Sequence, residues 1–204
     1  MFKQLLENLT QFASDKRFEA KVQEAYKFYE KRTGAIYHDD LAYEQRMTSF
    51  LEWFVFSVPA GDDGQRVLDV YRNEMARGSE EELAMVDSLS DNLHDLFVIK
   101  SSKNSIIKAT ALFTNKNFKI EDDRADTIHK GDIFEARIAN YEKRWFMTNG
   151  LCNHPPKALK YIKGEMKRIR QENGEGLLDF VFQLVSKSTK WERSRNIDVT
   201  EIYK

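Results

Sequence analysis

The chain has 204 residues, of which 41% are hydrophobic and 12% aromatic, and it contains only nine Gly and three Pro. This composition can build the core of a single domain, and it excludes collagen-like, low-complexity and disordered proteins. The formal net charge is −1, yet residues 51–95 hold three positive and eleven negative groups, a net of −8, and residues 96–170 hold sixteen and eight, a net of +8.

Apolar residues recur at helical spacing over the first 90 residues. Helices are predicted at about 2–13 and 15–33, with Ser14 as the N-cap of the second and Gly34 just after its end. A central core helix carrying Phe50, Trp53 and Phe54 is predicted between the caps Asp39-Asp40 and the stop at Pro59. Further helices are predicted at about 65–77, ending at Gly78, and from the capping box at 79–82 to about 89.

After residue 92 the apolar period changes from helical spacing to strand-like runs. Five short strands are predicted at about 96–99, 105–113, 117–120, 133–138 and 144–148, with turns at 103–104, 115–116 and 130–132. Pro155-Pro156 then restarts a helix, and a last helix is predicted at about 177–187, although residues 180–184 could also form a strand. From Thr189 on, the polar tail is expected to fray or to pack peripherally.

These elements predict an α+β protein with three parts. A helical region covers residues 1–92, and a small antiparallel five-stranded β-barrel or curved sheet covers residues 93–150. C-terminal helices in residues 151–204 pack on the rest, and the whole forms one cooperative domain.

Three stretches support a resemblance to known proteins. Residues 28–34 read FYEKRTG, residues 50–54 read FLEWF, and residues 131–138 read GDIFEARI. Together they resemble uncharacterised bacterial proteins that place a helical region before a small β-unit, a likeness that implies no activity. The run at 131–138 also looks like a strand of OB-type RNA-binding barrels. PilZ-type cyclic-dinucleotide receptors are a poorer match, because residues 126–131 only loosely match their turn and residues 100–103 lack the pair of arginines.

Three clusters could carry chemistry, and each has a structural alternative that we prefer. His38, Asp39, Asp40 and Glu44 could bind a hard cation, but acidic residues also cap helices. Cys152 and His154 share a loop, whereas a catalytic thiol and imidazole usually come from distant segments. The carboxylates of residues 121–126 are typical of a solvated turn. We therefore predict no catalytic residue, no metal and no cofactor, and an enzyme is the less favoured reading.

Six cations fall within fourteen residues of the helix predicted at 157–171. Lys160, Lys163, Lys167 and Arg170 follow helical spacing beside the apolar face, and Arg144 precedes them next to Trp145. Such a stripe can lie on phosphates or anionic lipid, and cations near an aromatic ring suit single-stranded nucleic acid. An ordinary solvated face is the explanation of the stripe that we prefer, and the acidic and basic blocks could neutralise each other.

We therefore expect a non-enzymatic binding or adaptor protein that acts through protein–protein contacts. The alternative is a nucleic-acid-binding protein that uses the β-unit and the basic helix at 157–171. A single cysteine excludes an internal disulfide and fits a reducing compartment. The N-terminus lacks the features of a signal peptide, and the most apolar run, at 50–59, is too short to span a bilayer. These features predict a cytoplasmic protein without a transmembrane segment, and they leave its oligomeric state open.

Overall fold

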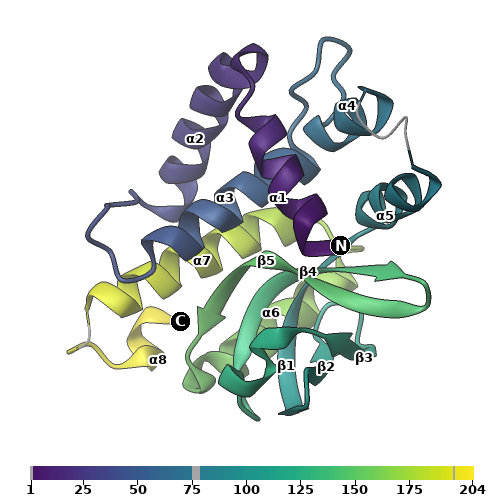
Figure 1. The fold of residues 1–204 in the computed structure, drawn as a ribbon. Coiled ribbons are helices and arrows are strands. Elements are labelled where there is room, and N and C mark those ends of the chain that lie inside the picture. The colour runs from purple at the N-terminus through teal and green to yellow at the C-terminus, as the bar shows by residue number, and fades with distance from the viewer. Residues whose placement is uncertain (1, 75–78, 195) are drawn as a thin grey trace. The chain divides into compact units, whose positions relative to one another are not determined.

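The computed structural model describes residues 2–74, 79–194 and 196–204 and confirms an α+β protein (Figure 1). Helical elements precede the strands: α1 (Phe2–Ala13), η1 (Lys16–Phe18), α2 (Glu19–Thr33), α3 (Tyr43–Ser57), α4 (Val67–Glu74) and α5 (Glu80–Ser90). The strands are β1 (Leu93–Lys103), β2 (Ile106–Ala111), β3 (Asn117–Glu121), β4 (Ile133–Tyr141) and β5 (Arg144–His154), with η3 (Asp123–Thr127) between β3 and β4. Then follow η4 (Pro156–Ala158), α6 (Leu159–Gln171), α7 (Leu177–Arg193) and α8 (Val199–Ile202).

Side-chain caps explain where two of the helical segments begin. Asp15, rather than the predicted Ser14, is the cap before η1, and its carboxylate accepts a hydrogen bond from the Arg17 N–H at 3.0 Å. A carboxylate is the stronger acceptor for the unpaired N–H groups of a first turn. Ser79 caps α5 as predicted, because its hydroxyl accepts a hydrogen bond from the Glu82 N–H at 3.3 Å. The predicted end of the preceding helix, at 75–78, lies outside the described residues.

The first three strands form an antiparallel meander, in which β2 pairs with β1 on one side and with β3 on the other. The β1–β2 turn consists of Asn104 and Ser105, whose φ angles of 52° and 59° are those of a type I′ hairpin turn. Across the five strands the order is β1-β2-β3-β5-β4, so β5 rather than β4 follows β3. The sheet is therefore mixed, and the prediction of an antiparallel sheet is confirmed only for part of it.

The chain is divided into two compact units, each assembled from separate stretches. Unit 1 consists of Met1–Tyr29, Ile36–Leu93 and Arg137–Leu151, and unit 2 consists of Glu30–Ala35, His94–Ala136 and Cys152–Lys204. The division passes through β4 and β5, so each of these strands begins in one unit and ends in the other. The three-part division predicted from the sequence remains a prediction.

Aromatic side chains from α2 and α3 fill much of the core of unit 1. Phe50 and Phe54 are fully buried, and the Phe50 ring lies 5.1 Å from that of Tyr26 and 5.4 Å from that of Tyr29. Trp53, the third anchor predicted from the sequence, is only half-buried and packs against Tyr29 with its ring 5.6 Å away. The core prediction for this helix thus holds for the two phenylalanines and in part for the tryptophan.

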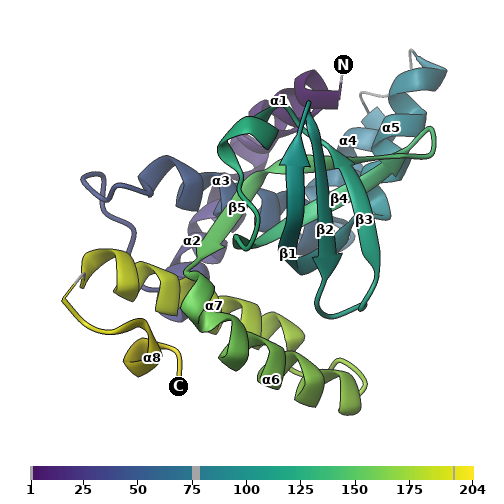
Figure 2. The same ribbon diagram turned by 90° about the horizontal axis from the view of Figure 1, so that it is seen from below.

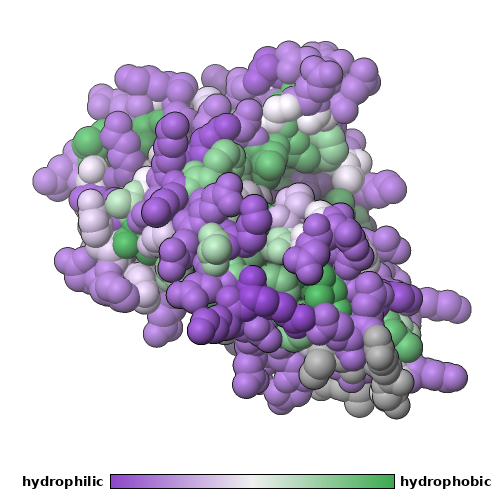
Figure 3. All heavy atoms as spheres, turned by 90° about the horizontal axis from the view of Figure 1, so that it is seen from above, coloured by the Kyte–Doolittle hydropathy of each residue, from purple (hydrophilic) through white to green (hydrophobic). Residues whose placement is uncertain are grey.

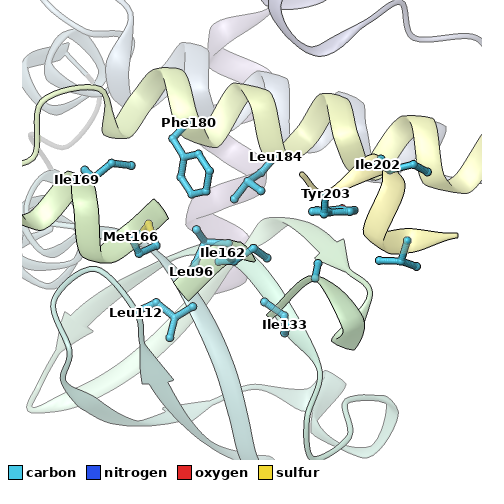
Figure 4. Close-up of a cluster of buried hydrophobic side chains, with 12 residues drawn as sticks. Leu96, Leu112, Ile133, Ile162, Met166, Ile169, Phe180, Leu184, Ile202 and Tyr203 are labelled. Carbon is cyan, nitrogen blue, oxygen red and sulfur yellow. The ribbon is translucent and has the colours of Figure 1, made fainter. Parts of the chain in front are cut away.

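Apolar side chains from β1, α6, α7 and the C-terminal segment form the core of unit 2 (Figure 4). α6 and α7 lie side by side (Figures 1 and 2) and turn Ile162, Met166, Phe180 and Leu184 toward one another. The same cluster includes Val199, Ile202 and Tyr203. The predicted fraying of the tail is therefore wrong: the i, i+3, i+4 spacing of these three residues gives even a four-residue helix an apolar face to bury.

Candidate nucleic-acid interface

Helix α6 has its apolar stripe fully committed to the core of unit 2. Pro155 and Pro156 set up the turn η4 before it, since proline is favoured at the first position of a helix. Ile162, Met166 and Ile169 are then buried at helical spacing among the side chains of α7 and β1 (Figure 4). A helix anchored in this way cannot turn its apolar face toward a lipid bilayer.

The exposed side of α6, beside its apolar stripe, carries the cations that the spacing predicts. Lys160, Lys163, Lys167 and Arg170 are all exposed. Within the part of the chain that the structure describes, none of the three lysines forms a salt bridge. The nearby carboxylates of Glu165 and Glu172 are instead held by Arg168, at 3.0 and 2.7 Å. The lysines at 160, 163 and 167 are three and four residues apart, so they repel one another along an uncompensated stripe.

The fifth predicted residue, Arg144, lies on a strand rather than on α6. It stands at the start of β5 in unit 1, whereas α6 belongs to unit 2. Its guanidinium lies 3.5 Å from the Glu142 carboxylate and 5.2 Å from the ring centre of Phe146. The adjacent Trp145 is half-buried, so it offers only part of its ring for stacking on a base.

Two other exposed lysines without a salt bridge in the described structure lie on the sheet, and they are not among the site residues predicted from the sequence. Lys108 of β2 is directly opposite Lys119 of β3, and both are exposed. Their position could have been found from the strand alternation, because each lies between two apolar residues of a run already predicted as a strand.

The possible cation site around His38, Asp39, Asp40 and Glu44 is held together by hydrogen bonds between its own residues and their neighbours. The Asp40 carboxylate accepts a hydrogen bond from the Tyr37 N–H at 3.0 Å and pairs with the Arg46 guanidinium at 3.3 Å. The N-cap of α3 is Ala42, which has no side-chain cap bond, so the predicted capping by Asp39 and Asp40 is wrong. Among the described residues, no group of three or more His, Cys, Asp or Glu side chains could hold a metal ion.

The comparison with protein families decides where this chain belongs. One family model, described as a family of unknown function (DUF7986), matches residues 1–177. The chain belongs to this family. The DUF7986 match includes all five residues of the predicted interface and ends at the first residue of α7. No curated protein and no solved structure shows significant similarity to the chain. No described helix of the DUF7986 chain is long and apolar enough to cross a membrane.

The Cys152 and His154 pair of the DUF7986 chain proves to be part of a buried cluster in unit 2. The Nδ1 atom of His154 is hydrogen-bonded to the Tyr203 hydroxyl at 3.1 Å, so this nitrogen does not serve to activate the thiol of Cys152. The Nε2 atom is buried without a hydrogen-bond partner in the described structure. Burial lowers the pKa of His154 from 6.5 to about 4, with the Glu135 carboxylate opposing the shift, and burial raises the pKa of Tyr203.

We expect this histidine to make the DUF7986 chain less stable in mild acid. Below pH 6.5 the unfolded chain binds a proton at His154 that the folded chain does not, so stability is lost as the pH falls from 6.5 toward 4. The expected loss in the free energy of unfolding between pH 7.5 and 5 is about 2 kcal/mol. Urea unfolding at a series of pH values measures it.

The variant His154→Gln is the control for this loss, because it removes the titrating group and keeps a polar side chain. Its stability should change less over the same pH range than that of the wild type. Burial raises the pKa of Glu52, which acts in the opposite direction, but this carboxyl is present in both proteins and cancels in the comparison. Equal losses in both proteins would show that His154 is not the group responsible.

Two further carboxylates have structural roles. Asp122 belongs to the acidic turn considered in the sequence, whereas Glu52 was not predicted to be part of any site. Asp122, in the acidic turn, accepts hydrogen bonds from the backbone and the guanidinium of Arg124, each at 2.8 Å. Glu52 is buried on α3, where its carboxylate accepts hydrogen bonds from the Thr148 hydroxyl at 2.7 Å and the Gly150 N–H at 2.8 Å. The helical pattern gave no sign of this burial, because the partners lie almost one hundred residues away.

Proposed function

We propose that this protein binds the phosphate backbone of nucleic acid with the exposed cations of α6. The observation that carries the proposal is the stripe of Lys160, Lys163 and Lys167, which is exposed and forms no salt bridge within the described residues. Cations held away from carboxylates can release the counterions condensed on a polyanion, and this release supplies most sequence-independent affinity. The stripe is thus better suited to an anionic partner than to neutralising the acidic block.

The strand order supports the same proposal. The order β1-β2-β3-β5-β4 is that of five-stranded OB-type barrels, which bind oligonucleotides on the face of their central strands. We therefore propose that the five strands close into a barrel of this type. This support rests on analogy of fold, and unrelated functions share such folds, so the lysine stripe remains the stronger argument. A cytoplasmic location is part of the proposal.

The test is a titration of labelled 20-nucleotide single strands and duplexes, of RNA and of DNA, at 50 and 200 mM salt. Three phosphate contacts on duplex DNA give a salt slope of about −2.7, so the affinity should fall about 40-fold over this range. The variant Lys160→Gln/Lys163→Gln/Lys167→Gln should lose this sensitivity.

A variant with the same change in net charge serves as the control. Lys27, Lys31 and Lys190 are exposed lysines outside α6 and outside the sheet, and their replacement by Gln should leave the salt slope unchanged. The proposal fails if the wild type does not bind at 50 mM salt, or if the α6 variant binds as the wild type does.

Protein binding is the second candidate, and exposed apolar side chains in the loop between α2 and α3 favour it. Leu41 is 85% exposed and Tyr37 56% exposed, which is unusual for large apolar residues close together in the chain. On the face of the molecule shown in Figure 3, hydrophobic residues appear as separate patches within a largely hydrophilic surface. If this loop binds a protein partner, the complex should be saturable with 1:1 stoichiometry. Leu41→Ser should abolish the complex, and Lys27→Gln should leave it intact.

A further inference from the structure

Strands β1, β2 and β3 lie side by side in unit 2 (Figure 2). They carry a second group of uncompensated cations. Alternation along the strands turns Ile107, Ala109 and Ile120 inward, where they are buried. The neighbouring residues of the same strands turn outward. One outward row runs across all three strands through Ser101, Lys108 and Lys119, which the register places opposite one another. All three are exposed.

The arrangement of charge in this row is unfavourable for the isolated protein. Lys108 and Lys119 are direct cross-strand partners, with Cβ atoms about 5 Å apart by the geometry of antiparallel pairs, and like charges so placed repel. Lys100 lies within β1 at the register shift between Ile99 and Ser101, Lys103 ends β1, and Lys116 lies in the loop before β3. All three are exposed as well. No salt bridge in the described structure involves any of these five lysines. A bound polyanion would relieve the repulsion that the fold leaves in place.

The outward face has nothing on which a base could stack. The rings of β1 and β3, Phe97 and Phe118, face each other at 6.1 Å on the inner side, where Phe118 is the register partner of the buried Ala109. The next outward row places Thr110 beside Asn117, joined by a hydrogen bond of 2.7 Å. Contacts on this face are therefore electrostatic and made with phosphates, and they do not read the sequence of bases.

The lysine row lies close to α6 within unit 2. Val98, which the register places opposite Thr110 in the neighbouring outward row, packs against the apolar cluster that contains Ile162 and Met166 of α6. The outer face of the strands thus reaches the core cluster covered by α6. A nucleic acid held on the α6 stripe could reach the sheet lysines along the same unit.

We propose that the outward face of β1–β3, centred on Lys108 and Lys119, is a second phosphate-binding surface that holds the backbone of RNA or DNA without sequence preference. The proposal takes its substrate class from the proposed function, but it rests on different residues. An anionic membrane is the less favoured partner, because Ser101, Thr110 and Asn117 beside the two lysines are polar. On the other side, Ile106 is partly buried and its register partner is the acidic Glu121.

The experiment compares the wild type with Lys108→Gln/Lys119→Gln, with the α6 triple variant and with the combination of both. Binding to two 20-nucleotide single-stranded RNAs of different base composition is followed as a function of salt. We expect the sheet variant to reduce the magnitude of the salt slope by about 1.4, since each contact to a single strand contributes about 0.7. The two RNAs should bind with affinities within about threefold of each other.

Thermal unfolding at low salt provides an independent readout. Removing the opposed lysines should raise the melting temperature of the sheet variant while its RNA affinity falls, a combination that damage to the fold cannot produce. Binding of the sheet variant equal to that of the wild type overturns the inference and leaves the role of α6 intact. Loss confined to the sheet variant would support the inference and refute the role of α6. Binding to phosphatidylserine vesicles but not to RNA overturns both.

Discussion

Phe50→Ala should lower the free energy of unfolding by about 3–5 kcal/mol. Phe50 is only 1% exposed, and its ring contacts Tyr26 and Tyr29 of α2. Truncation leaves a cavity among side chains that are fixed from several directions, so the site cannot collapse around the smaller residue. Guanidinium unfolding followed by circular dichroism at 222 nm measures the loss.

Phe28→Ala is the matched control, because it removes the same side chain from the same unit. Phe28 is 43% exposed and stacks on Trp53 at a centroid distance of 5.8 Å. Its loss should cost about 1 kcal/mol or less, the value of one aromatic pair at the surface. If the two substitutions had the same effect, Phe50 would not be the anchor of α3.

Asp95→Ala should destabilise the protein by at least about 3 kcal/mol, because it leaves four donors in a buried or partly buried site without an acceptor. Asp95 is buried in unit 2, where Oδ1 accepts hydrogen bonds from the N–H groups of Leu96 at 2.7 Å and Phe113 at 2.8 Å. Oδ2 accepts from the N–H and the hydroxyl of Thr114, at 3.0 and 3.1 Å. One side chain thus fixes the start of β1 to the segment that follows β2.

Two further variants sharpen this prediction. Asp95→Asn keeps one carbonyl oxygen but turns an amide N–H₂ toward donors, so its stability should fall between those of the wild type and Asp95→Ala. Asp126→Ala removes an exposed carboxylate of the same unit and should change the free energy of unfolding by no more than about 0.5 kcal/mol. Hydrogen exchange at the amides of Phe113 and Thr114 locates the effect: slow exchange retained in Asp95→Ala would contradict the assignment.

The part of the candidate interface on α6 could be predicted from the sequence because helical periodicity is local. The spacing of Lys160, Lys163 and Lys167 fixes a common face as soon as the helix is recognised, and the apolar stripe of Ile162 and Met166 fixes the neighbouring, buried side. Both deductions need only about ten consecutive residues. For the same reason, the boundaries predicted for the first helix and the end of the second agree with the structure.

Strand alternation indicates which lysines of the sheet point outward, but their pairing could not be predicted, because it depends on the exact turn. The sequence places the β1–β2 turn at residues 103–104, whereas the structure places it at Asn104 and Ser105. A change of one residue in a turn changes the register, and so changes which residues of the two strands lie opposite one another. Lys108 meets Lys119 only because the turns after β1 and β2 both have the lengths observed.

The buried polar residues could not be predicted for a different reason. From the sequence, Glu52 would be assigned to the surface. Its hydrogen-bond donors, Thr148 and Gly150, are far away in the sequence, so its burial could not be predicted from its neighbours. His154 likewise meets Tyr203 across 49 residues. Long-range hydrogen bonds of this kind leave no periodic pattern, and a single sequence contains no other trace of them.

The composition of unit 1 has a consequence for how the protein is made on the ribosome. Its N-terminal helices are translated first, but the unit also contains Arg137–Leu151, which are added only after the stretch His94–Ala136 of unit 2 has been synthesised. Until then the Glu52 carboxylate lacks its two donors, and the hydroxyl of Ser57 lacks its contact with Arg137 at 2.9 Å. The nascent helices can collapse but cannot reach their final packing. In many proteins the N-terminal part folds before the rest emerges from the ribosome. Unit 1 of this chain cannot fold in that order.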